Sequence, residues 1–136
     1  MGLPILSVDF DGVLHSYASG WKGAAIIPDP PFPGAMQFLK DMTQHFTVAV
    51  FSSRSNMEGG IAAMISWIER NARLEFGDGG ISWVSELQYP TVKPPAKVSI
   101  DDRAITFTGI WPTVADLKGF EPWYSTKQKV RVYAER

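Results

Sequence analysis

The stretch Val8-Asp9-Phe10-Asp11-Gly12-Val13-Leu14 decides how the rest of the chain is interpreted. An apolar run precedes it, so we expect residues 4–10 to form a buried strand that ends in acidic side chains. Residues two apart in an extended segment face the same side, which places the carboxylates of Asp9 and Asp11 together. Gly12 then permits a backbone turn that most residues resist.

A second acidic pair, Asp101 and Asp102, follows a predicted strand over residues 96–100. Parallel strands end at the same edge of a sheet, and ligands bind outside that edge, so we expect this pair to meet Asp9 and Asp11. Carboxylates that converge repel one another, which raises the pKa of one of them or demands a cation. Mg²⁺ prefers oxygen ligands, so the sequence predicts a magnesium site there.

Helices and strands are predicted to alternate along the chain. The apolar patterns predict helices over residues 35–45 and 57–72, a strand over 46–51, a short helix over 81–87, an extended stretch over 88–92, a strand over 105–107 and a helical turn over 112–117. This alternation indicates an α/β fold: a parallel sheet with helices on both faces, in a three-layer, Rossmann-like arrangement.

The length of 136 residues predicts a single domain spanning residues 1–136, with no room for a large cap domain. Residues 15–33 are polar, aromatic and rich in proline and glycine, which predicts a long loop or a small hairpin, and loops of this length are often functional. Residues 121–136 form a polar and aromatic tail that the pattern does not place.

Composition excludes several classes of protein. The chain has no cysteine, which excludes disulfides, zinc–thiolate sites and cysteine nucleophiles. The net charge of −1 does not indicate nucleic-acid binding, although a local basic patch is compatible with it. No apolar run approaches the ~20 residues that span a bilayer, and the N-terminus lacks the basic region of a signal peptide. We therefore expect a soluble cytoplasmic protein without a membrane partner.

Four segments resemble, in order, the motifs of the haloacid dehalogenase-like (HAD) hydrolase superfamily. Residues 8–14 resemble the first motif, DxDGxL. Phe51-Ser52 resembles the second, Lys93-Pro94 the third and Ile100-Asp101-Asp102 the fourth. Together they span residues 8–102. The resemblance implies a HAD-like fold of the small capless type.

The resemblance also implies chemical roles. Asp9 is implied to be the nucleophile, which forms an aspartyl-phosphate. Asp11 is implied to act as general acid and then as general base. Ser52 is implied to hydrogen-bond the phosphoryl oxygens, and Lys93 to neutralise the charge that develops there.

The metal site implied by the resemblance uses Asp9, the backbone carbonyl of Asp11, and Asp101, with Asp102 binding Mg²⁺ through water or orienting its neighbours. Aspartate at position 11 is typical of the phosphatases and mutases of the family, and mutases usually need a cap domain. The implied activity is therefore that of a phosphatase acting on a phosphomonoester. The sequence does not name the substrate or the oligomeric state.

Some assignments have rivals. Ser53 competes with Ser52, and Lys97 competes with Lys93 although Lys97 lies near the start of its strand. Arg54 is interpreted as a substrate contact or a surface arginine at a helix start. His15 is interpreted as a substrate or proton-transfer residue of the loop, or as part of its packing.

Two other functions stay open. One is a non-catalytic module that binds phosphate or regulates a partner. The other is a phosphatase acting on polynucleotide ends, for which the basic cluster would be in the tail, at Lys127, Lys129, Arg131 and Arg136.

Overall fold

The computed structural model describes residues 2–123. Its contacts divide the chain into two compact units, Met1–Ile100 and Asp101–Arg136, where the sequence predicts one domain. The tail predicted over residues 121–136, with its basic cluster, lies outside the described residues from position 124 onward.

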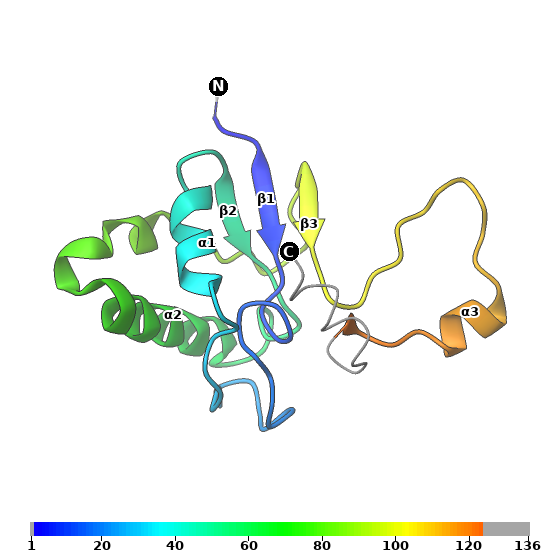
Figure 1. The fold of residues 1–136 in the computed structure, drawn as a ribbon, viewed down its shortest axis with the longest axis horizontal. Helices are drawn as coiled ribbons and strands as arrows, with labels where there is room; N and C mark the ends of the chain where they lie inside the picture. The colour runs from blue at the N-terminus through cyan, green and yellow to red at the C-terminus, as the bar shows by residue number, and fades with distance from the viewer. Residues whose placement is uncertain (1, 124–136) are drawn as a thin grey trace. The chain divides into compact units, whose positions relative to one another are not determined.

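Three parallel strands form the sheet of the first unit. β1 (Ile5–Val8) lies between β2 (Thr47–Val50) and β3 (Val98–Ile100), so the strand order is β2-β1-β3 (Figure 1). In this register Val8 pairs with both Val50 and Ile100. All three strands therefore end at one edge of the sheet, which confirms the predicted α/β class with a parallel sheet.

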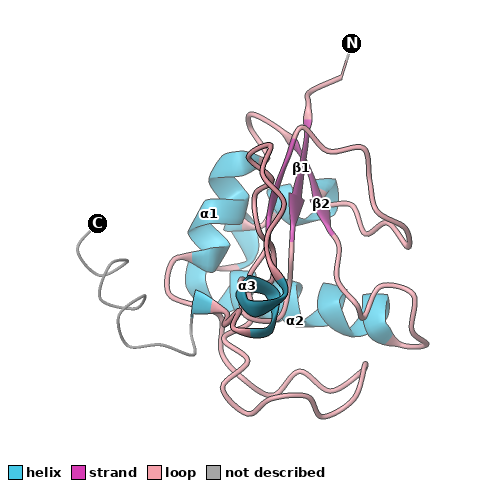
Figure 2. Cartoon of the chain, turned by 90° about the vertical axis from the view of Figure 1, so that its right-hand side faces the viewer, coloured by secondary structure: helices cyan, strands magenta, loops and turns pink. Residues whose placement is uncertain are grey.

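Helices α1 (Ala35–Met42) and α2 (Gly60–Phe76) flank the sheet and contact each other, and Figure 2 shows α1 beside the strands. Alternate residues of a strand share a face, so Leu6, Val8 and their register partners point the same way. One core joins this face to both helices; its members include Leu6, Val8, Val48, Val50, Met36, Leu39, Met64 and Ile68. A full three-layer arrangement stays a prediction.

Several element boundaries differ from the sequence-based expectation. The first helix ends at Met42, before residue 45, and α2 runs from Gly60 to Phe76 where residues 57–72 were expected. Residues 81–87 contain a 3-10 helix, η2 (Ser82–Glu86), which follows another, η1 (Asp78–Gly80).

The predicted strand over residues 105–107 is wrong. Ile105 and Phe107 alternate with threonines as strand residues do, yet they lie in an irregular segment and are 49% and 56% exposed. A strand needs the backbone of a neighbour, and none of the described residues pairs with this segment. Of the extended stretch over 88–92, only Gln88 bridges to the sheet, at Ala49.

Residues 15–33 form a loop without helix or strand, as predicted. Side chains hold it in place: Asp29 accepts hydrogen bonds from the backbone N–H and the hydroxyl of Ser19, at 2.8 and 2.6 Å. The indole N–H of Trp67, on α2, donates to the backbone oxygen of Asp29 at 3.1 Å.

In the described part of the second unit, residues 101–123, a short helix forms, α3 (Val114–Lys118). Thr113 caps it, because its hydroxyl accepts from the backbone of Asp116 while the Asp116 side chain accepts from the backbone of Thr113. Among residues 2–123, no helix has the length and apolar content needed to cross a bilayer.

Gly60 allows the first turn of α2 to lie against the backbone of Arg54. A Cβ at position 60 would lie 2.8 Å from the carbonyl carbon of Arg54 and closer still to its oxygen. Gly60→Ala should therefore lower the free energy of unfolding by about 1–3 kcal/mol, measured by urea denaturation.

The matched control is Gly79→Ala, where a Cβ would meet nothing within 4 Å. Alanine is normally the better helix former, so at position 60 its helix propensity would stabilise the protein while its contact with the Arg54 backbone would destabilise it. A Gly60→Ala variant that is as stable as the parent would contradict the close approach of Arg54.

Candidate functional site

The end of β1 is tied to both neighbouring strands. The backbone N–H of Asp9 donates to the carbonyl of Ile100 at 2.9 Å, and the N–H of Phe51 donates to the carbonyl of Val8 at 3.1 Å. The residues that directly follow β2 and β3 therefore start beside Asp9, as expected for the carboxyl edge of a parallel sheet.

Three carboxylates gather at this edge: Asp9, Asp101 and Asp102 each offer an oxygen, and these oxygens lie within 4.8 Å of one another. Asp101 and Asp102 are the two residues after β3, so the pairing of β3 with β1 brings them to Asp9. Asp101 accepts a hydrogen bond from the backbone of Arg103 at 2.7 Å. The side chain of Asp102 is only 2% exposed, and the Arg103 guanidinium lies 3.8 Å from it.

The chemistry of these donors fits Mg²⁺. Carboxylate oxygens are hard ligands, and Mg²⁺ is usually held by one or two carboxylates together with water and substrate phosphate. A carboxylate as buried as Asp102 is costly next to two others unless positive charge accompanies it. Asp9, Asp101 and Asp102 are thus the residues that could hold the metal.

Asp11 belongs to a different network. Its carboxylate accepts two hydrogen bonds from Arg54, Nε to Oδ2 at 2.8 Å and Nη2 to Oδ1 at 3.1 Å, and His15 Nδ1 lies 2.8 Å from Oδ1. Burial raises the pKa of Asp11, but the hydrogen bonds from His15 and Arg54 and the positive charge of Arg54 outweigh it and lower the pKa overall. Asp11 is therefore an ionised carboxylate that already has a cation.

Arg54 is fully buried. Its Nη1 donates to the backbone oxygens of Gly23, Ala24 and Ile26 at 2.7, 2.9 and 3.2 Å, and its guanidinium lies 4.6 Å from the ring centre of Trp21. The structure thus places Arg54 inside the protein, where the sequence suggested a substrate contact or a surface arginine.

His15 is also fully buried and joins Asp11 to the loop. The backbone N–H of Asp29 donates to His15 Nε2 at 3.1 Å, so in this arrangement Nδ1 carries the hydrogen and donates to Asp11. The imidazole stacks on Phe10 and meets Trp67 edge-on, with ring centres 5.6 Å apart in both cases. His15 is therefore held between Asp11 and the loop.

Ser52, which follows Phe51 at the end of β2, is buried in a turn. Its hydroxyl oxygen accepts from the backbone N–H of Arg54, and its own N–H donates to the Ser55 hydroxyl, both at 3.0 Å. A hydroxyl that accepts a bond still has a hydrogen to donate, as the implied role requires. Its rival Ser53 is exposed.

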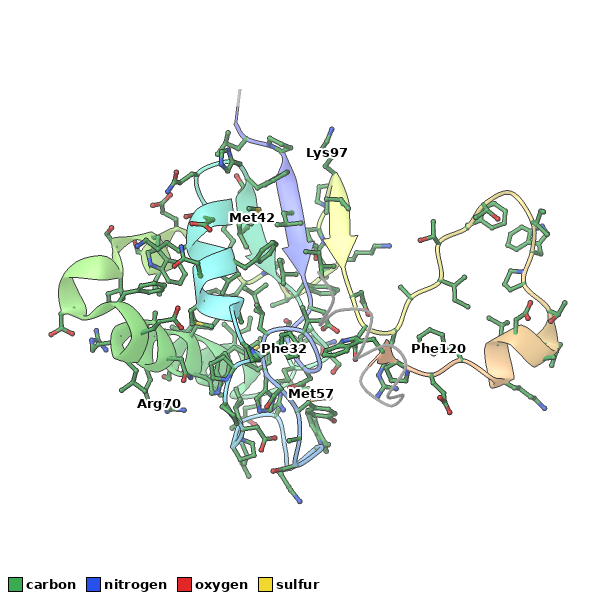
Figure 3. The ribbon with its side chains drawn as sticks, viewed as in Figure 1. Phe32, Met42, Met57, Arg70, Lys97 and Phe120 are labelled. Atoms are coloured by element: carbon green, nitrogen blue, oxygen red, sulfur yellow. The ribbon has the colours of Figure 1, made fainter. Side chains whose placement is uncertain are left out.

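The two candidate lysines lie in different places. Lys97 donates its backbone N–H to Ile5 at 2.8 Å, so it lies at the amino end of the sheet, away from the carboxylates (Figure 3). Lys93 is exposed in the irregular stretch before β3. Because Lys97 lies at the wrong end of the sheet, Lys93 is the better candidate for the lysine that neutralises charge at the phosphate. This role of Lys93 stays a prediction.

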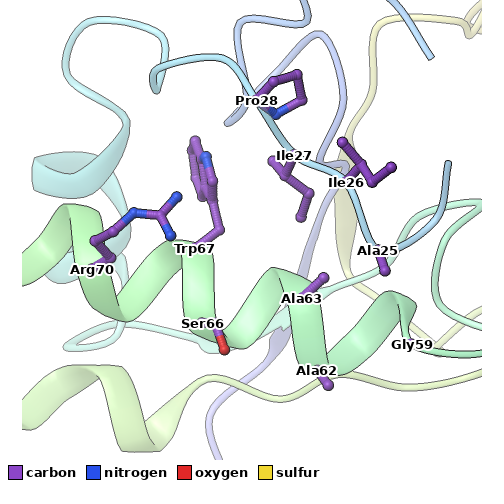
Figure 4. A pocket seen from close by; sticks show the side chains of 10 residues that line it. All are labelled: Ala25, Ile26, Ile27, Pro28, Gly59, Ala62, Ala63, Ser66, Trp67 and Arg70. Atoms are coloured by element: carbon purple, nitrogen blue, oxygen red, sulfur yellow. The ribbon is translucent and has the colours of Figure 1, made fainter. Parts of the chain in front are cut away.

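A groove of about 590 Å³ lies between residues 25–28 of the loop and α2. Figure 4 shows the side chains that line it. Ile26, Ile27 and Trp67 line it, and Arg70 supplies a cationic side chain. Sequence analysis identified neither this groove nor the role of Asp29, because both depend on how the loop folds against α2.

Removing the carboxylate of Asp11 should strongly destabilise the protein. Asp11→Ala would leave the buried guanidinium of Arg54 without a counter-charge, which typically costs about 3–5 kcal/mol. Urea denaturation measures the loss. The control is Asp78→Ala, which breaks an exposed ion pair with Arg73 and should cost less than about 1 kcal/mol. Similar losses in the two variants would contradict the buried pair.

Mg²⁺ should stabilise the folded protein through the three gathered carboxylates. At 100 times the Kd, a ligand that binds only the folded form adds about 2.7 kcal/mol, seen as a higher midpoint of thermal unfolding. Asp101→Asn should remove this shift, whereas Asp41→Asn, a change on α1, should keep it. A shift of the same size in Asp101→Asn and the parent would exclude this site.

Comparison with protein-family models, with curated proteins and with solved structures finds no match for this chain.

Proposed function

We propose that this protein is a Mg²⁺-dependent phosphohydrolase of the HAD-like type, which acts on a phosphomonoester through an aspartyl-phosphate on Asp9. The observation that carries the proposal is the meeting of Asp9, Asp101 and Asp102 at the carboxyl edge of a parallel sheet. Asp9 belongs to the first of the four motifs and Asp101 and Asp102 to the fourth, so their meeting supports the metal-binding role that the resemblance implies for them.

The central position of β1 supports Asp9 as the nucleophile. Because β2 and β3 flank β1, side chains from both neighbours can act on a group bound to Asp9. Ser52 is the second residue after β2, and Asp101 and Asp102 are the two residues after β3. A phosphoryl group at this edge would thus be within the range of residues from three strands.

In the proposed reaction, an Asp9 oxygen bonds to phosphorus while the bond from phosphorus to the ester oxygen breaks. The alcohol leaves with a proton from the general acid. Water then bonds to phosphorus and gives a proton to the base, and the bond to Asp9 breaks to release phosphate. Ser52 and Lys93 are proposed to stabilise the phosphoryl oxygens. Mg²⁺, when bound, would offset the negative charge of the carboxylates and of the phosphate.

The network around Asp11 places a requirement on its proposed acid role. A carboxylate that accepts from Arg54 and His15 has a lowered pKa and holds a proton poorly. Substrate binding would have to change this environment for Asp11 to give a proton to the leaving oxygen. Apo geometry often differs in this way from that of a reacting complex.

The same observation favours one alternative, a module that binds Mg²⁺ and phosphate without turnover. In such a protein the carboxylate of Asp11 would be a permanent structural partner of Arg54. Activity measurements separate the two functions.

Hydrolysis of p-nitrophenyl phosphate in the presence of Mg²⁺ tests the proposal. Asp9→Asn should reduce kcat by about 10⁴-fold or more, because it removes the nucleophile without changing the size of the side chain. EDTA should abolish turnover, and Asp41→Asn should leave it unchanged.

The substrate panel should include phosphorylated oligonucleotides at low and high salt, because activity on them that falls with salt indicates a polynucleotide-end phosphatase.

Turnover that survives in Asp9→Asn would rule out the proposed nucleophile. A parent protein that is stabilised by Mg²⁺ but hydrolyses no phosphoester on a broad panel would instead support the non-catalytic module.

A further inference from the structure

We infer that Arg54 is a positioning residue: its guanidinium joins Asp11 and loop residues 21–29 into one unit and does not bind the substrate phosphate. The coupling between Arg54, Asp11 and the loop stands on the contacts alone. Its effect on turnover rests on the proposed function.

The guanidinium is the centre of this unit. Two of its nitrogens hold both oxygens of Asp11, and the third holds three loop carbonyls between Gly23 and Ile26. Trp21 stacks on its face at 4.6 Å. Only the planar fork of arginine serves a carboxylate, backbone carbonyls and an aromatic face at once, so lysine cannot replace it.

Burial makes these contacts depend on one another. Arg54 is 0% exposed and the Asp11 side chain is 14% exposed, so each charge relies on the other for compensation. If the loop moved away, Nη1 would lose its carbonyls, and the guanidinium would turn toward water and release Asp11. The position of the loop and the orientation of the carboxylate therefore change together.

His15 fastens the loop to the same carboxylate at a second point. It donates from Nδ1 to Asp11 and accepts the backbone N–H of Asp29 at Nε2. Trp67 then holds the carbonyl of Asp29 from α2. The loop is thus tied to Asp11 at residues 23–26 through Arg54 and at residue 29 through His15.

This arrangement explains why Arg54 is unsuited to bind phosphate directly. All three of its nitrogens already donate within the protein. Asp11 is separated by one residue from Asp9, whose carboxylate accepts from the N–H of that residue, Phe10. A displaced Asp11 would therefore disturb the reacting group, while substrate binding would be little affected.

The first measurement needs no substrate. The full chain is labelled with 5-fluorotryptophan, and the ¹⁹F resonance of Trp21 is assigned from Trp21→Phe. Arg54→Lys should move the Trp21 resonance, because the stacked guanidinium is lost, and should leave that of Trp83, which donates to Gly80, in place. Arg73→Lys, a change in an exposed ion pair, is the matched control and should move neither.

The second measurement separates positioning from binding. With p-nitrophenyl phosphate, Arg54→Lys should lower kcat by about 100-fold, as expected for a misplaced catalytic group, with KM changed less than about threefold. Methylguanidinium added to Arg54→Ala should restore both the Trp21 resonance and at least about tenfold in kcat, since it can fill the vacated site.

Each outcome is decisive. An unmoved Trp21 resonance in Arg54→Lys overturns the coupling, and a raised KM with unchanged kcat overturns positioning in favour of substrate binding. If Arg54→Lys does not fold, Asp11→Asn provides the same resonance test, because it weakens the hold on the guanidinium. A parent protein without turnover defeats the proposed function, while the Trp21 resonance still decides the coupling.

Discussion

The pair formed by Arg54 and Asp11 is the interaction on which the first unit depends. A buried guanidinium is costly unless an opposite charge and further hydrogen bonds compensate it. Here the compensation comes from the end of β1 and from loop carbonyls between Gly23 and Ile26. The absent side chain of Gly60 also lets α2 begin against the backbone of Arg54. The end of β1, the loop and the turn that leads from Arg54 into α2 therefore have to be in place together.

Two carboxylates of one motif, those of Asp9 and Asp11, have different electrostatic surroundings. Asp9 lies among other acids, Asp101 and Asp102, and such a cluster favours binding of a cation. Asp11 has the cation of Arg54, from the chain itself. The first arrangement favours binding of a cation, and the second favours a fixed orientation. Both residues are aspartates, so the difference in their electrostatic surroundings comes from the neighbouring side chains alone.

The sequence predicted what depends on local pattern. Apolar runs identified the strands, and the rule that parallel strands end together predicted that Asp9 would meet Asp101 and Asp102. The partner of Asp11 was not predictable, because Arg54 is 43 positions away and arginine is almost never fully buried. The expected strand at residues 105–107 was wrong for a related reason. An alternating pattern indicates which side chains would face the core, but a strand forms only where a neighbouring backbone accepts and donates its hydrogen bonds.

The loop of residues 15–33 shows how the site and the fold depend on each other. A segment rich in glycine and proline forms neither helix nor strand here, so its backbone groups need other partners. Arg54, His15 and Trp67 supply several of those partners, and Arg54 and His15 each also bond the carboxylate of Asp11. The order of the loop is therefore a property of the charged network. A change that neutralises or displaces Asp11 must act on the loop as well as on any chemistry at Asp9.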